Sequence, residues 1–101
     1  MTDIARAQQA LVHRILEGDG TASPAERRAA FENNGVASLA TLVEKSVAQP
    51  TAITDHDVVA ARTAGLTEDQ IFEIVVCAAV GQSMRQYQSA RAALSVANRR
   101  E

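Results

Sequence analysis

The fold is decided by residues 67–82, TEDQIFEIVVCAAVGQ, where a helix start signal leads into nine apolar residues interrupted by a single charge, Glu73. Thr67 can cap the first turn through its hydroxyl, and Gln70 can return a hydrogen bond to the backbone of the cap. A helix that is apolar nearly all round is buried on most of its faces. The stretch therefore predicts a central, largely buried helix.

Beyond Gly81 the apolar pattern narrows to one stripe whose members alternate between spacings of four and three residues. The stripe consists of Val80, Met84, Tyr87, Arg91 and Leu94. Such spacing predicts one long apolar C-terminal helix that presents a seam to another helix, with Gly81 as a place for a kink. The same helix carries its arginines towards its C-terminal end, where cations suit the helix dipole.

Start and stop signals divide the remaining chain into four shorter helices. Residues 4–15 repeat apolar side chains at helical spacing and stop before Gly18. A second helix starts at the Ser23 cap and runs to about Asn34, and a third, marked by Leu39 to Val47, ends before Pro50. Thr54 opens a fourth helix, which Gly65 closes. Residues 1–101 are therefore predicted to form one all-α domain of about five helices.

The composition predicts a thin core that needs further cover. The apolar fraction is 47%, but twenty of these residues are alanine, which buries little surface. A chain of this length buries only about two-thirds of the surface that its unfolded form exposes. We therefore expect a homo-oligomer.

Charge and hydropathy argue against two classes of partner. With a net charge of -2, the chain has no field that would gather nucleic acid. Its longest apolar run, residues 71–80, is about half of a membrane span, and the amino terminus lacks an apolar signal segment. We expect no nucleic-acid partner, no membrane association and a cytoplasmic location.

Cys77 is the single cysteine of the chain, so the protein cannot form an internal disulfide or carry out dithiol chemistry alone. Its place in the apolar run favours a small buried hydrophobe over a reactive thiol. We expect no metal site and no cofactor, because the two histidines and the acids form no recognisable ligand set.

Five further residues are weak candidates for a site. Glu73 needs a partner on a buried helix, which Arg62 or Arg85 could supply, and it marks either a subunit contact or a ligand pocket. Gln82, beside Gly81, could line a cavity. His56 and Glu44 are candidate general acids or bases, although a solvated first turn and an exposed carboxylate are the simpler interpretations.

The segment 54–82, TDHDVVAARTAGLTEDQIFEIVVCAAVGQ, resembles the carboxymuconolactone decarboxylase and alkyl hydroperoxidase D-like (AhpD-like) superfamily. The resemblance implies an AhpD-like helical bundle that assembles as a dimer, trimer or hexamer. Peroxidases of this family use a CxxC pair with a histidine and a glutamate. Without a gap, those positions fall on Pro50, Ile53, Asp57 and Ser38; a one-residue gap would bring His56 to the histidine position, but no gap supplies the cysteines, so a dithiol peroxidase is not expected.

Three hypotheses for function follow from the residues and the resemblance. The first is a non-redox member that acts as an oligomeric assembly component or binds a small ligand. The second is a decarboxylase-like enzyme for a small carbonyl or lactone, with His56 or Glu44 as acid or base beside an arginine. The third is a one-cysteine antioxidant protein that uses Cys77.

Overall fold

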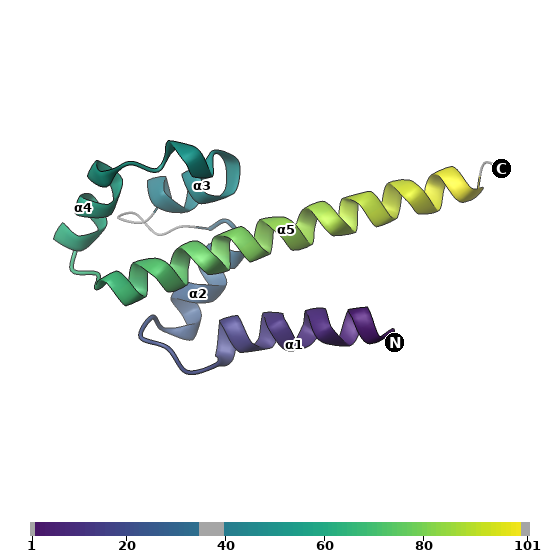
Figure 1. Ribbon diagram of the computed structural model, residues 1–101, viewed down its shortest axis with the longest axis horizontal. Helices are drawn as coiled ribbons and strands as arrows, with labels where there is room; N and C mark the ends of the chain where they lie inside the picture. Colours follow the sequence, from purple (N-terminus) through teal and green to yellow (C-terminus); the bar gives the residue numbers. More distant parts are fainter. Residues whose placement is uncertain (1, 35–39, 100–101) are drawn as a thin grey trace.

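The structure, a computed structural model, describes residues 2–34 and 40–99. Within these two ranges, five α-helices and one short 3-10 turn follow each other (Figure 1): α1 Asp3–Glu17, α2 Pro24–Phe31, α3 Ala40–Ala48, η1 Pro50–Ala52, α4 Asp55–Thr63 and α5 Glu68–Arg99. No strand occurs in these two ranges. The predicted all-α class and the number of helices are confirmed.

Local capping explains where three of the helices begin. The Ser23 hydroxyl accepts the N–H of Glu26 at 3.1 Å, and the Glu26 carboxylate accepts the N–H of Ser23 at 3.3 Å. Thr54 and Asp57 form the same reciprocal pair at the start of α4, and Thr67 and Gln70 form it ahead of α5. Capping boxes were predicted at Ser23 and Thr67, whereas at Thr54 only the cap was predicted; all three satisfy N–H groups that a helix start leaves free.

The helix ends agree less closely with the sequence patterns. α4 ends before Gly65, which has the left-handed φ of +102° expected of a residue that closes a helix. α2 ends at Phe31 and not near Asn34, because Asn33 already adopts a left-handed φ of 61°. Leu39, expected in the third helix, lies outside the described residues.

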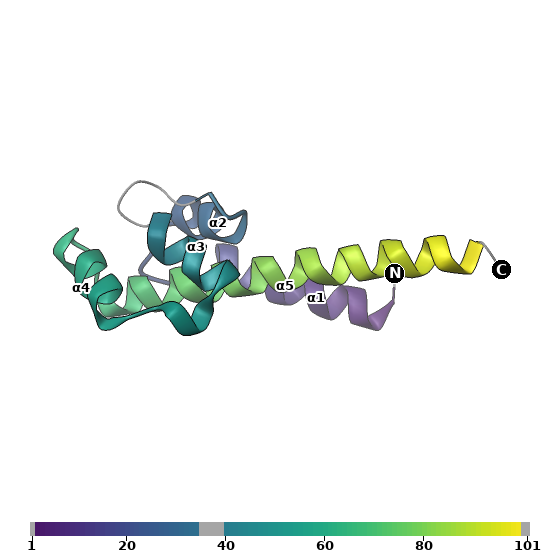
Figure 2. The same ribbon diagram turned by 90° about the horizontal axis from the view of Figure 1, so that it is seen from above.

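The core lies where α2 and α3 pack on the first half of α5 (Figures 1 and 2). Ile74 and Cys77 of α5 are almost completely buried, together with Val43 of α3. Gly81 is also buried, because the carbonyl of Phe31 at the end of α2 occupies the space that a Cβ atom would need. α5 thus approaches α2 most closely at this glycine.

The predicted long C-terminal helix is present, but it is not apolar along its length. α5 is one continuous helix of 32 residues, and every residue from 86 to 99 is exposed. In Figures 1 and 2 the last turns of α5 project past α1 and the other helices. The apolar run of α5 ends at Val80, beside the contact of Gly81 with the end of α2, and the exposed second half of the helix has no such run. Within the described part of the chain, no helix is long and apolar enough to cross a membrane.

Candidate functional site

Glu73 ties α5 to the loop between α1 and α2. Its carboxylate accepts the N–H of Ala22 at 2.6 Å and the N–H of Thr21 at 2.9 and 3.1 Å, and the Thr21 hydroxyl donates to it at 3.2 Å. Partial burial alone would raise the pKa of Glu73, but these bonds and the charge of Arg27 outweigh it and lower the pKa. Glu73 is therefore held as a carboxylate.

Arg27 of α2 is a buried cation, 5% exposed, that fastens the end of α1. Its Nη1 donates to the carbonyls of Gly18 at 2.8 Å and Ile15 at 3.2 Å, and its Nε donates to the carbonyl of Ala22 at 3.1 Å. The last carbonyls of a helix have no partner within the helix and carry partial negative charge. The buried guanidinium of Arg27 therefore supplies hydrogen-bond donors to the carbonyls at the end of α1.

Cys77 lies one turn after Glu73 and is buried, with 1% exposure. Its thiol donates to the carbonyl of Ile15 at 3.5 Å, so Arg27 and Cys77 share this acceptor. Burial raises the pKa of the Cys77 thiol, with Arg27 opposing and Glu73 reinforcing the effect. The reactive thiolate is disfavoured here, as expected for a structural cysteine.

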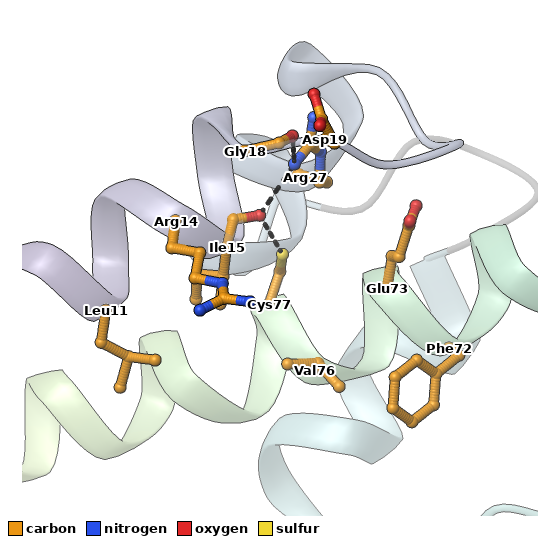
Figure 3. Close-up of a pocket in the computed structure, with 10 residues that line it drawn as sticks. All are labelled: Leu11, Arg14, Ile15, Gly18, Asp19, Arg27, Phe72, Glu73, Val76 and Cys77. Atoms are coloured by element: carbon orange, nitrogen blue, oxygen red, sulfur yellow. Dashed lines mark hydrogen bonds between the residues drawn. The ribbon is translucent and has the colours of Figure 1, made fainter.

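These groups line one side of a cavity of about 550 Å³ between α1, the following loop and the first half of α5 (Figure 3). Its apolar wall consists of Leu11, Ile15, Phe72 and Val76, and its polar groups are Arg14, Asp19, Arg27 and Glu73. In Figure 3 the Cys77 sulfur and the Glu73 carboxylate point towards α1 and its loop, whereas Phe72 points away. The cavity joins the only cysteine to the only charge of the apolar run.

A second surface lies along α5 on the side opposite the core. It consists of Phe72, Val76, Ala79, Ser83, Tyr87, Ala90 and Leu94, which we call the outer face of α5. All are exposed except Val76, which is half-buried, and Phe72 and Leu94 are 69% and 62% exposed. Leu11 of α1 is a further exposed apolar side chain close to this face, and it lines the same cavity as Phe72 and Val76.

The structure does not bring the predicted catalytic candidates together. His56 is exposed in the first turn of α4, and Glu44 is exposed on α3 beside a hollow whose lining includes Lys45 and Asn33. Cys77 lies apart from both, in the cavity of Figure 3. In the described residues no group of three histidine, cysteine or acidic side chains is placed to hold a metal ion.

The three pocket candidates are also divided. Glu73 lines the cavity of Figure 3, whereas Arg85 lines a hollow on the other side of α1. Arg85 donates to the carbonyl of Phe31 at 2.6 Å and to the side chain of Gln82 at 3.2 Å. The predicted partners of Glu73 are thus engaged elsewhere, since Arg62 pairs with Glu68 at 3.3 Å. Backbone N–H groups bind Glu73 in their place.

Two of the positions that the sequence resemblance aligns with a peroxidase relay have clear structural roles. Asp57 caps α4 and accepts Lys45 Nζ at 2.8 Å, which, with the Thr54 N–H, holds the pKa of Asp57 at about 2. Ile53 packs against the core. Pro50 begins η1, and Ser38 lies outside the described residues.

Sequence reasoning missed Arg27 and Thr21. Arg27 is one of three consecutive charged residues, Glu26 to Arg28, on a short helix, and such a run is typical of a solvated face. The Glu73 contact joins residues 52 positions apart. In the sequence, only Gly20 could have indicated that another group approaches this loop closely. A Cβ atom at this position would collide with the Glu73 carboxylate, whose nearest oxygen would lie at 2.6 Å.

Comparisons with protein-family models, with curated proteins and with solved structures found no match to this chain. The function therefore has to be argued from the geometry of the cavity and of the outer face of α5.

Proposed function

We propose that this protein is a non-redox assembly component that associates with further copies of itself through the outer face of α5. The observation that carries the proposal is the exposure of this face from Phe72 to Leu94, where all of its residues except the half-buried Val76 are exposed. Residues 86–99 are exposed throughout, and they include Tyr87 and Leu94 of the outer face, which are 42% and 62% exposed. Several large apolar side chains exposed along one face are typical of an interaction site.

The small core supports the same proposal. Helical stability in proteins comes mostly from packing of an apolar face, and a solvated extension of about four turns gains little of it. Ten residues make up the buried apolar core of the described chain, and four of them are alanine. Packing α5 against another subunit would supply the cover that a chain of this size lacks.

Sedimentation velocity at micromolar concentration tests the proposal. The wild-type chain should sediment as a dimer or larger species, and Leu94→Asp, which places a charge on the outer face, should sediment as a monomer. Ser89→Asp adds the same charge on an exposed residue of α5 outside that face and should leave the assembly intact. A wild-type monomer would overturn the proposal.

Binding of a small molecule is a second candidate role, favoured by the cavity of Figure 3. Its volume of about 550 Å³ lies in the range of about 300–1,000 Å³ that is usual for ligand sites. Its apolar wall and Arg14 suit a small aromatic carboxylate. Chemical-shift changes on titration with benzoate, lost in Arg14→Gln, would support this role, and shifts identical in both proteins would contradict it.

Membership of the AhpD-like superfamily is part of the proposal and depends on residues 54–82. The decarboxylase hypothesis requires His56 or Glu44 beside an arginine, and the hollow beside Glu44 has no arginine among its lining residues. A one-cysteine peroxidase would need an accessible thiolate, whereas Cys77 is buried with a raised pKa. Both alternatives therefore rank below the assembly role.

A further inference from the structure

We infer that α5 pairs with α5 of a second copy in antiparallel orientation, about a two-fold axis at Ser83. This inference rests on the proposed assembly function and specifies its partner and geometry. The two halves of α5 differ in charge and in side-chain size, and this difference decides between a parallel and an antiparallel pair.

The outer face is straight enough to contact another helix along its whole length. At 100° per residue, Phe72, Ser83 and Leu94 recur every 11 residues and stay within about 20° of one line. Ile74 and Gly81, which are buried in the core, lie on the opposite side of the helix. A second helix can therefore lie along this face over about 33 Å without displacing the core.

Side-chain sizes complement each other in the antiparallel arrangement. Residues at equal distances from Ser83 face each other across a two-fold axis, because such an interface uses the same patch on both copies. Phe72 then faces Leu94, Val76 faces Ala90, and Ala79 faces Tyr87. Each of the last two pairs sets a large side chain against an alanine, so the helices can approach closely at Ser83. A parallel pair would set Tyr87 against Tyr87 and leave the alanines facing each other.

Charge favours the same direction. The first two turns of α5 carry Glu68, Asp69 and Glu73, and the sequence has no acidic residue from 74 to 100. Arg91 lies on the same side of α5 as Glu73, at 80° from the line through Ser83 by helical geometry. In the antiparallel pair, Arg91 of one copy lies within about 3 Å along the axis of the level of Glu73 in the other.

Asp69 lies on that side too, one turn further towards the start of the helix. Opposite charges therefore meet at both ends of an antiparallel pair, whereas a parallel pair would place the basic ends of both helices at the same level and the acidic ends at the other. Juxtaposed like charges suppress the wrong arrangement. Arg91 also stacks over the Tyr87 ring, 6.0 Å from its centre, which keeps its guanidinium near the outer face.

Cross-linking through one added cysteine tests the orientation, since the native Cys77 is buried and should not cross-link in the folded protein. Ser83→Cys, on the axis, should form a disulfide-linked dimer under mild oxidation. Ala90→Cys should not, because its two copies lie about 21 Å apart along the axis and a disulfide spans less than about 7 Å between Cα atoms. Wild-type protein is the matched control.

A mixture of Val76→Cys and Ala90→Cys chains, distinguished by a tag, should yield the mixed cross-linked dimer. Efficient cross-linking of Ala90→Cys alone would overturn the antiparallel inference in favour of a parallel pair and leave the assembly proposal standing. Sedimentation as an oligomer without any cross-link at Ser83→Cys would overturn the inference in the same way. A wild-type monomer would overturn both.

Discussion

The carboxylate of Glu73 in α5 accepts the backbone N–H of Ala22 at 2.6 Å, and the loop that provides this N–H is fastened from its other side by the buried guanidinium of Arg27. Gly20 allows the close approach, because a side chain there would collide with the carboxylate. One ion on each side thus holds the end of α1 and the start of α2 against the central helix.

Replacing Glu73 with glutamine should destabilise the fold. The substitution removes the charge from a group that accepts two backbone N–H donors, and hydrogen bonds to charged groups contribute more than neutral ones. Because the site is half-exposed, we expect a loss of about 1 kcal/mol in the free energy of unfolding. Urea unfolding followed by circular dichroism measures it. Glu68→Gln, whose ion pair with Arg62 is exposed, should change stability much less, and equal losses would refute the role assigned to Glu73.

The contribution of Glu73 should depend on pH. Its folded pKa lies below the ordinary value of 4.5, so the folded state binds this proton less readily than the unfolded state does. The stability difference between wild type and Glu73→Gln should be full above about pH 5 and shrink as the pH falls through the folded pKa. A series of urea titrations between pH 3 and 7 checks this; a constant difference would contradict it.

The stability that Asp57 contributes should also fall as the pH is lowered, and its pKa defines the pH range of this fall more closely. The pKa falls from 3.8 to about 2 because Lys45 and the Thr54 N–H bind the carboxylate. Its stabilising effect should be complete above about pH 4 and disappear as the pH falls towards 2. Thermal unfolding of Asp57→Asn against wild type over this range measures the change. Asp55→Asn, on the exposed first turn of α4, is the control, and the same pH dependence in both variants would contradict the role assigned to Asp57.

Gly81→Ala should be destabilising although alanine is the better helix former. In an exposed helix this change would stabilise by about 1 kcal/mol. At position 81 the added Cβ would meet the carbonyl of Phe31, so α2 would have to move away from α5. We expect a net loss of about 1–3 kcal/mol by chemical denaturation. Ser89→Ala on the exposed end of α5 should be neutral or stabilising, and a stabilised Gly81→Ala would show that the helices are not in close contact there.

Cys77 should react slowly in the native protein. Its thiol is buried and its pKa is raised, so reaction with an aromatic disulfide reagent must wait for local or global opening. The native rate should be at least about tenfold below the rate in denaturant. Ser89→Cys, which adds an exposed thiol on α5, should react in a separate fast phase. A native Cys77 that reacts as fast as this added thiol would revive the antioxidant hypothesis.

The elements that depend on local signals were predictable from the sequence. The Ser23, Thr54 and Thr67 caps each need only a partner three residues away, and all three appear as expected. The burial of Cys77 followed from its apolar neighbours. Contacts between distant segments could not be read in this way, because the pattern around Glu73 shows that a partner is needed but does not identify Thr21 and Ala22.

Arg27 shows a second limit of sequence patterns. Its charged neighbours predict exposure, but Arg27 is buried because its guanidinium donates hydrogen bonds to the carbonyls at the end of α1. The seam predicted beyond Gly81 includes Tyr87 and Leu94, which do lie on the outer face. The exposure of Phe72 was not predicted, because Phe72 belongs to the apolar run and nothing in the neighbouring residues distinguishes one exposed side chain from the buried ones.

Hydrogen exchange along α5 should depend on protein concentration. Residues 86–99 are exposed in the single chain, so little besides their own helical bonds protects their amides, whereas packing against a second α5 would restrict opening. Peptides from this segment should exchange slowly well above the dissociation constant and faster on dilution, while peptides from residues 71–81 change little. Leu94→Asp should show the fast pattern at every concentration and Ser89→Asp the wild-type pattern. Exchange of residues 86–99 that is fast and independent of concentration would mean that the outer face of α5 has no second copy packed on it.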